Sequence, residues 1–236
     1  MPASSDADAL ATFVGKWRAR WPEWSVAEVF VLPSQRAKAL AWAALQQELT
    51  DAAWAGSDPR PGEAKLGWWQ EELHGWSRGA RRHPLGIALQ REPAPWARLA
   101  ASLPALQGSR ARPHDEDEAF AALQLFADAA SAVDAALFGN GDGSARLIGG
   151  QLLQQRLSHD AAAAVPLDVL ARAGDGEGVD QWTQALQQRW PSACDAPRPR
   201  RVWAALALAR LQRGDANRPL SAWRALWTAW RAARHG

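Results

Sequence analysis

The sequence contains no tyrosine, one cysteine and one methionine among its 236 residues. Without tyrosine, no phenolic hydroxyl is available as an acid, a base or a hydrogen-bonding group. The one cysteine, Cys194, excludes an internal disulfide framework and any metal cluster built on several cysteines. We therefore expect a protein of a reducing compartment, the cytoplasm.

Residues that favour strands are scarce as well, since Ile87 and Ile148 are the two isoleucines of the chain. Alanine, leucine, arginine and glutamine, which favour helices, are abundant. Apolar residues recur at helical spacing in segments that proline and glycine separate. A chain of 236 residues buries a sizeable core without needing a second domain. We predict an all-α fold in which residues 1–236 form a single-domain multi-helix bundle.

Targeting signals and long apolar runs are missing too. Residues 1–8 are small and acidic, unlike the basic and then apolar start of a secretory signal. No apolar run reaches the length that a membrane-spanning helix requires. We expect at most a peripheral contact with the inner face of a membrane.

The charge balance argues against a nucleic-acid partner. The isoelectric point is about 9.2, but the formal net charge is only +2. Few lysines and no tyrosine lose protons at alkaline pH, so a small excess of arginine is enough to raise the isoelectric point. A nucleic-acid binder concentrates its arginines on one face, whereas these are spread through helical segments beside Glu, Asp and Gln. We expect no nucleic-acid partner.

Tryptophan is the most unusual component, with 15 in the chain. It fills volume and donates one hydrogen bond, but it cannot act as an acid or a base. Near the C-terminus, Trp223, Trp227 and Trp230 fall on one helical stripe with arginines around them. Such a stripe occurs on helices that lie in a membrane surface or bind a partner and, more often, on helices that pack against a core. We favour packing against the core.

Periodicity and punctuation predict the individual helices. Leu66, Trp69, Leu73 and Trp76 form the apolar stripe of a helix that opens at residue 61. The acidic run 115–118 is expected to cap the first turn of a helix that reaches residue 138, because negative charge stabilises that end of the helix dipole. Further helices are expected over about 6–22, 25–32, 34–54, 84–90, 95–106, a segment around 151, a short one after 166, 182–190, 201–212 and 219–234, with turns at 139–143 and 175–178.

Several stretches of the sequence resemble a known family. Residues 30–89 contain FVLPSQRAKALAWAALQQELTDAAWAGSDP and then KLGWWQEELHGWSRGARRHPLGIAL, and the C-terminus reads PLSAWRALWTAWRAARHG. Between them lie FADAASAVDAALFG and LIGGQLLQQRLSHDAAAAVPLDVL. Together they resemble squalene/phytoene synthases, in which a Leu-Pro and a basic segment lead into a helix that ends in an aspartate motif, followed by a Trp-Trp-rich helix and a His-Pro. The resemblance covers most of the chain at low identity and implies an isoprenoid synthase type of bundle around a central cavity.

The resemblance implies a chemistry that the residues themselves test. Head-to-head prenyl condensation ionises an allylic diphosphate, and Mg²⁺ ions that need several oxygen ligands hold the leaving group. The family supplies these ligands from two helices, each with aspartates one turn apart. Its first motif, Asp-Asp-x-x-Asp, falls here on residues 50–54, where Asp51 remains but Thr50 and Trp54 replace the other two aspartates. An arginine that usually precedes the motif falls on Gln47.

The second aspartate motif is lost completely. Anchored on Gln151, it places an asparagine at Gln154 and aspartates at Ser158 and Ala162. His159 and Asp160 lie nearby, but neither restores the one-turn spacing. The resemblance therefore retains packing features of the family but few of its metal ligands.

Other carboxylates are candidates for a rebuilt site with one metal ion. Glu48 is three residues before Asp51, and Glu71 and Glu72 lie on the next helix. We favour a solvated helix face for the three glutamates, since paired surface carboxylates are common. The five histidines are scattered without the spacing of metal ligands.

These losses lead to a functional prediction. Removing one preorganised electrostatic group commonly costs about 10²–10³-fold in rate, so the loss of most of them predicts a diverged, catalytically inactive squalene/phytoene synthase-like protein. Such a protein binds an isoprenoid or lipid in an apolar cavity, or it acts with a protein partner as an assembly or scaffold protein, as does a mitochondrial respiratory-complex assembly factor of the family. The candidate ligand-binding residues are Gln47, Asp51, Gln151 and Gln154, and no cofactor is expected.

The alternative is an active prenyl transferase that uses farnesyl or geranylgeranyl diphosphate. It would depend on Mg²⁺ in a rebuilt site, and Asp51 is the one candidate ligand that the motifs retain.

Overall fold

The computed structural model describes residues 2–139, 144–174, 176–191 and 196–234, with side chains from residue 6 onward. Within these residues the chain forms α-helices and one 3₁₀ turn, and no strand. The all-α prediction is therefore confirmed.

The elements follow one another with short connections. In the first half they are α1 (Pro2–Arg20), α2 (Trp24–Ala27), η1 (Glu28–Phe30), α3 (Pro33–Trp54), α4 (Arg60–Trp76), α5 (Gly86–Leu89) and α6 (Trp96–Gly108). In the second half they are α7 (Glu116–Phe138), α8 (Ser144–His159), α9 (Ala161–Ala164), α10 (Leu167–Arg172), α11 (Gly178–Arg189), α12 (Arg198–Leu211) and α13 (Ala222–Arg234).

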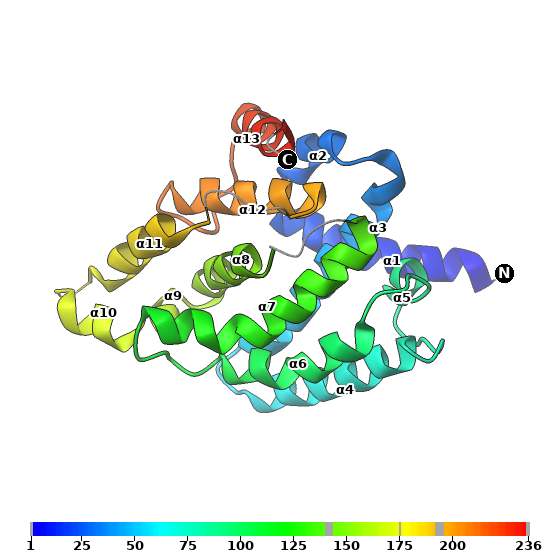
Figure 1. Ribbon diagram of the computed structural model, residues 1–236, viewed down its shortest axis with the longest axis horizontal. Coiled ribbons are helices and arrows are strands. Elements are labelled where there is room, and N and C mark those ends of the chain that lie inside the picture. The colour runs from blue at the N-terminus through cyan, green and yellow to red at the C-terminus, as the bar shows by residue number, and fades with distance from the viewer. Residues whose placement is uncertain (1, 140–143, 175, 192–195, 235–236) are drawn as a thin grey trace.

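The long helices stack as a series of neighbours. Helix α4 packs on α6, α6 on α7, α7 on α8, α8 on α12 and α12 on α13, while α3 packs against α1, α4, α6 and α8 (Figure 1). Helix α13 lies at one end of this series, beside α2 and α12. The α3–α8 junction thus lies in the interior, and α13 lies at the edge.

Local sequence explains the main helix boundaries. Pro33 opens α3, where its missing N–H and fixed φ are tolerated. Asp115 caps α7, because its side chain accepts a hydrogen bond of 2.8 Å from the backbone N–H of Glu118. Gly139, at φ 74°, ends the same helix in a backbone conformation that favours glycine.

Most predicted helices are confirmed to within a few residues. The structure adds one that the sequence reading missed, α9, which Asp160 caps by accepting from the backbone N–H of Ala163 at 3.0 Å. Three features of the sequence analysis lie outside the described residues: most of the predicted turn at 139–143, the start of the turn at 175–178, and Cys194.

Tryptophan builds much of the core. Along α4, the predicted stripe of Leu66, Trp69, Leu73 and Trp76 is buried as expected. Trp76 meets Trp69 and Trp96 edge to face, at ring-centroid distances of 6.4 and 5.1 Å, and Trp96 meets Trp42 at 6.2 Å. Edge-to-face contacts of this kind add to the stabilisation that area burial gives, so this chain of indoles ties α3, α4 and α6 together.

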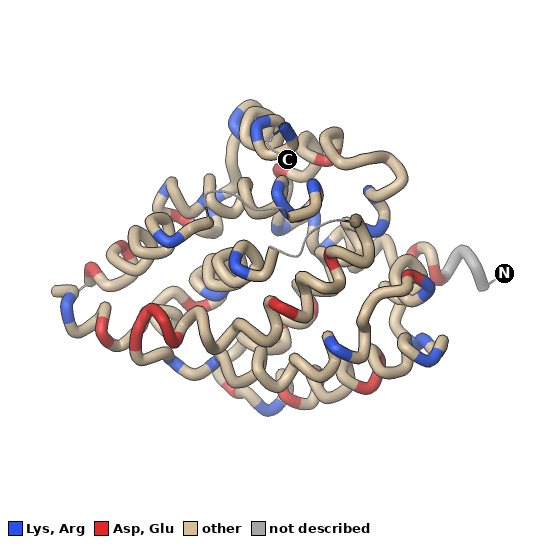
Figure 2. Tube along the Cα trace, in the orientation of Figure 1, with Lys and Arg blue, Asp and Glu red and all other residues tan. Residues whose placement is uncertain are grey.

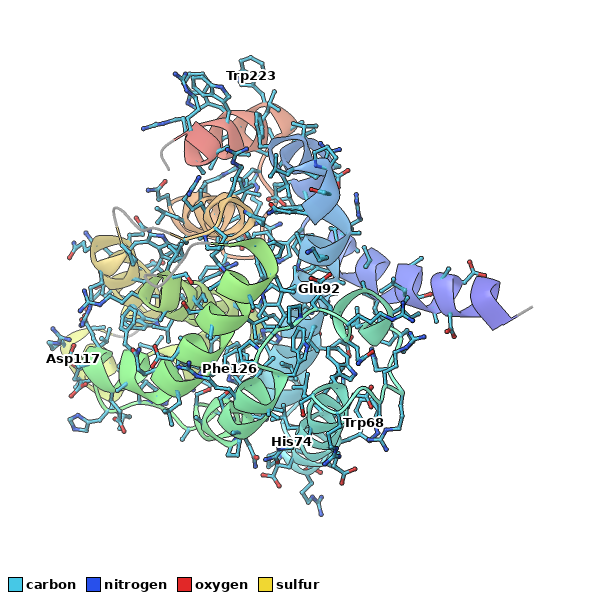
Figure 3. All side chains as sticks on the ribbon, turned by 45° about the vertical axis from the view of Figure 1, so that its right-hand side comes forward. Trp68, His74, Glu92, Asp117, Phe126 and Trp223 are labelled. Carbon is cyan, nitrogen blue, oxygen red and sulfur yellow. The ribbon has the colours of Figure 1, made fainter. Side chains whose placement is uncertain are left out.

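Helix α7 is more apolar than the sequence reading allowed. By length and composition alone, residues 116–138 suffice to cross a membrane. Half of its most apolar stretch is buried inside the bundle, and Phe126 is fully enclosed (Figure 3). Packing between α6 and α8 accounts for this apolar character.

The prediction for the C-terminal tryptophans was wrong. The face of α13 that packs on the bundle consists of Ala225 and Ala229, whereas Trp223 and Trp227 are 76% and 52% exposed. Figure 3 shows Trp223 at the outer edge of the molecule, pointing away from it. The small alanine stripe satisfies the helix contact, so the tryptophan stripe faces outward.

Candidate functional site between α3 and α8

The last turns of α3 and α8 meet at Asp51, the one aspartate that the first motif retains. Its Oδ1 accepts hydrogen bonds from His159 Nε2 and from Arg20 Nη1, both at 2.7 Å. Arg20 comes from the end of α1 and His159 from the end of α8. The carboxylate therefore joins three helices through charge-assisted hydrogen bonds.

These partners also set the ionisation of the carboxyl group. Burial raises the pKa of Asp51, but the hydrogen bonds from His159 and Arg20 outweigh this effect and bring the pKa below its ordinary value of 3.8. Asp51 is therefore ionised near neutral pH, and its charge is balanced by the groups that it contacts.

The other positions of the first motif serve packing. Thr50 is fully buried and donates its hydroxyl to the backbone oxygen of Gln47 at 3.1 Å. Trp54 packs edge to face on the His159 ring at 5.7 Å, and its Nε1–H donates to Ser109 Oγ at 3.1 Å. Where the family pattern has carboxylates, this chain therefore has a buried hydroxyl and an indole that hold α3 against its neighbours.

The second motif lies opposite the first, but its last predicted position does not. Helix α8 ends at His159, and Ala162 belongs to α9, where it is exposed. Because the helix breaks at Asp160, Ala162 does not follow Ser158 by one turn of the same helix. Asp160, whose side chain caps α9, separates the two positions.

A small cavity lies at the junction. Its volume is about 110 Å³, and it is lined by Trp17, Arg20, Trp21, Gln47, Gln155, Ser158, His159, Trp203, Arg210 and Asn217. Trp17 meets Trp203 edge to face at 5.6 Å, and Trp21 meets Trp203 at 6.0 Å. Sites for drug-sized ligands typically measure about 300–1,000 Å³. The cavity thus has room for a few waters or a small polar molecule, not for a prenyl chain.

Three groups on this cavity's lining residues have no hydrogen-bond partner among the described residues. They are the indole Nε1–H groups of Trp17 and Trp203 and the amide Oε1 of Gln47, all buried. A buried polar group without a partner is costly.

The interior holds a second polar cluster, which sequence reasoning missed. Arg200 on α12 donates through Nε to Asp134 Oδ2 at 2.7 Å, and it also donates to Gln151 Oε1 at 2.8 Å. Gln46 Oε1 accepts from the same guanidinium at 2.9 Å, and Trp42 Nε1 donates to Asp134 Oδ1 at 2.6 Å. All five residues are buried. Charge and hydrogen bonds thus connect α3, α7, α8 and α12 in the interior of the bundle.

A buried ion pair fixes the end of α12. Arg210 donates through Nε to Glu23 Oε1 at 2.7 Å, and its guanidinium lies 4.0 Å from the Trp21 ring centroid. Glu23 also accepts from the backbone N–H of Leu220 at 2.8 Å, just before α13 begins. This pair positions α13 against the start of the chain.

The remaining predicted residues divide between these clusters. Gln151 serves the Arg200 cluster, while Gln154 donates through Nε2 to the backbone oxygen of Ala216 at 3.2 Å. The amide nitrogen of Gln151 and the amide oxygen of Gln154 have no partner among the described residues. Gln47 and Ser158 therefore line the junction cavity, whereas Gln151 and Gln154 make separate structural contacts.

The solvated-face prediction holds for Glu71 and is wrong for its two companions. Glu72 is buried and accepts from Trp76 Nε1 at 2.8 Å and from the backbone N–H groups of Arg82 and His83. Glu48 is mostly buried and pairs with Lys65 at 2.7 Å. Donors on the same or the next segment of the chain satisfy both carboxylates. The spacing of apolar residues along the sequence does not show such pairing.

The residues at the junction do not fit a magnesium site. Mg²⁺ prefers several oxygen ligands in octahedral geometry, but the Asp51 carboxylate is engaged by Arg20 and His159, and Thr50, Trp54 and Ser158 supply no further carboxylate. Among the described residues, no three His, Cys, Asp or Glu side chains gather in a group that would hold a metal ion.

Comparisons with protein-family models, with curated proteins and with solved structures find no match to this chain. The likeness to squalene/phytoene synthases therefore rests on the residues quoted above.

Proposed function

We propose that this chain is a diverged squalene/phytoene synthase-like protein, with an isoprenoid synthase type of bundle, that no longer transfers prenyl groups and acts through its surface as an assembly or scaffold protein. The observation that carries the proposal is the state of Asp51. The one retained motif aspartate is bonded to His159 and Arg20, both at 2.7 Å, and a positively charged partner occupies the place that a metal ion would need.

The size of the junction cavity supports the same choice. Three tryptophans line a space of about 110 Å³, so a fifteen- or twenty-carbon chain does not fit there without moving the indoles. Of the two modes that the sequence leaves open for an inactive protein, isoprenoid binding and scaffolding, the interior favours scaffolding.

The buried polar clusters support it as well. The middle of the bundle holds a hydrogen-bonded polar cluster of Arg200, Asp134, Gln46 and Gln151. Removing one partner of its buried ion pair would destabilise the fold, because the other charge would stay buried without a partner. Such an interior holds the helices in a fixed arrangement, so the outer faces of the bundle are the surfaces that would bind a partner.

Calorimetric titration tests the proposal. Purified protein is titrated with MgCl₂ alone, with inorganic diphosphate alone and with both together, beside the Asp51→Asn variant. We expect no saturable magnesium-dependent binding of diphosphate in either protein. Saturable binding in the wild type that disappears in Asp51→Asn would overturn the proposal and favour the active transferase.

A further inference from the structure

The outer face of α13 presents aromatic side chains to solvent. Trp223 and Trp227 are 76% and 52% exposed, and Trp230 follows them on the same stripe. The Trp227 and Trp230 rings stack at 4.8 Å, and the Arg234 guanidinium lies 4.6 Å from the Trp230 ring centroid. Exposed indoles grouped in this way mark an interaction surface.

Neighbouring segments extend this apolar face. Val29 and Leu32, from η1 and the residues after it, are 56% and 49% exposed. They line an open groove of about 340 Å³ together with Trp230. On the other side of α13, an open groove of about 590 Å³ runs between α12 and α13, with Trp227 on its edge. The apolar surface is therefore broader than the helix itself.

The same end of the chain is strongly basic. Residues 198–236 contain nine arginines and one acidic residue, Asp215. Two of these arginines, Arg200 and Arg210, are buried against Asp134 and Glu23. Arg198, Arg218 and Arg224 are exposed, and α13 itself carries no acidic residue (Figure 2). An anionic partner therefore complements this surface.

We propose that α13 docks on an anionic phospholipid bilayer, with Trp223 and Trp227 at the level of the headgroups and the arginines against lipid phosphates. Helices with tryptophan on one side and arginine around it bind membrane surfaces in this way. A second copy of the chain fits the surface less well, because a symmetric interface would bring like-charged arginines together. This inference goes beyond the proposed function and does not depend on whether the Asp51 junction is catalytic.

Vesicle co-sedimentation of the full chain tests the proposal. Wild-type protein is mixed with phosphatidylcholine vesicles and with vesicles that also contain phosphatidylglycerol, at low and at high salt. We expect binding to the anionic vesicles that falls as salt rises. The variant Trp223→Ser/Trp227→Ser should bind at least about tenfold more weakly than the wild type. The variant Arg218→Gln/Arg224→Gln should bind about tenfold more weakly.

Matched double variants control for nonspecific effects. Leu125→Ser/Leu170→Ser removes exposed apolar side chains from α7 and α10, and Arg78→Gln/Arg91→Gln removes exposed arginines near α4 and α5. Both should bind vesicles like the wild type. Equal binding by the tryptophan variant and the wild type would overturn the proposal.

Sedimentation velocity without vesicles tests whether a second copy of the chain occupies this surface instead. We expect a species whose mass does not change in the tryptophan variant. Self-association that the tryptophan variant abolishes, in a protein that does not bind anionic vesicles, would assign the surface to a second copy instead. A monomer that binds neither type of vesicle would also overturn the proposal, and a protein partner would then be sought.

Discussion

The interior of the bundle and the outer face of α13 reverse the usual distribution of side chains. The interior buries Asp134, Arg200, Glu23 and Arg210, whereas α13 exposes Trp223 and Trp227. Each of these two arginines has a carboxylate partner within hydrogen-bond distance, so pairing offsets part of the cost of burying the charges. On α13 the indoles of Trp223 and Trp227 face water, and an apolar partner that covered them would be favourable.

Tryptophan has two roles in this protein. Trp42, Trp69, Trp76 and Trp96 are fully or almost fully buried and tie helices together. The α13 tryptophans contribute little to that core, because Ala225 and Ala229 make the contact with the bundle. One residue type thus builds the fold in one region and a surface in the other.

The largest expected difference is between two tryptophan truncations. Trp69→Ala removes a side chain that is 1% exposed and should lower the free energy of unfolding by about 3–5 kcal/mol. Trp223→Ala removes one that is 76% exposed and should change it by less than about 0.5 kcal/mol. Urea unfolding followed by circular dichroism measures both. Similar losses for the two variants would end the distinction between the regions.

A comparable loss is expected from breaking the central ion pair. Arg200→Met leaves the Asp134 carboxylate buried without its guanidinium and should cost about 3–5 kcal/mol. The double variant Asp134→Leu/Arg200→Met removes both charges and should recover much of that loss. If the single variant unfolds like the wild type in urea, the cluster does not hold the helices together.

A smaller effect is expected from pH. Burial among Phe13, Trp68 and Trp69 lowers the pKa of His83 from its ordinary 6.5 to about 4. The unfolded chain therefore binds a proton more readily than the folded one, so stability is full above pH 6.5 and falls as the pH drops towards 4. Allowing for the partial exposure of the ring, we expect a loss of about 1–3 kcal/mol over this range.

The His83→Asn variant isolates this contribution. Its urea midpoint should change less between pH 6.5 and 5 than that of the wild type. An identical pH dependence in the two proteins would show that His83 is not the group responsible.

The smallest effect is expected at the Asp51 junction. Asp51→Asn weakens hydrogen bonds to Arg20 and His159 at a partly exposed site and should cost about 1 kcal/mol. The control, Asp58→Asn, alters an exposed pair with Arg60 and should leave the urea midpoint unchanged. A loss as large as that of Arg200→Met would place the main anchor of the bundle at Asp51.

Sequence periodicity predicts much of this fold, and the reason is local. Leu66, Trp69, Leu73 and Trp76 repeat at helical spacing, and Asp115 caps α7 through a contact three residues away. Turn chemistry and apolar stripes act over short distances, so the chain displays them directly.

The interior pairs depend on contacts between residues far apart in the chain. Arg200 meets Asp134 across 66 positions, and Arg210 meets Glu23 across 187. One signal was visible in the sequence: Asp134 sits within residues 132–138, AVDAALF, which are otherwise apolar, and a carboxylate buried there needs a partner. The partner's identity, however, follows from the packing of α12 on α7 and α8.

The orientation of α13 could not be read from its sequence either. Both its alanine stripe and its tryptophan stripe have the spacing of a buried face. The choice between them depends on how closely α2 and α12 approach, and the structure shows that the smaller side chains fill that contact.

The central claim, that the retained aspartate holds helices together and catalyses no prenyl transfer, is tested most directly by a product assay. Purified wild-type protein is incubated with farnesyl diphosphate and with geranylgeranyl diphosphate in the presence of Mg²⁺, and the organic extract is analysed for squalene and phytoene. We expect neither product above the level of a protein-free control. Magnesium-dependent formation of either product at enzymic rates, abolished by Asp51→Ala in a protein that remains folded, would contradict it.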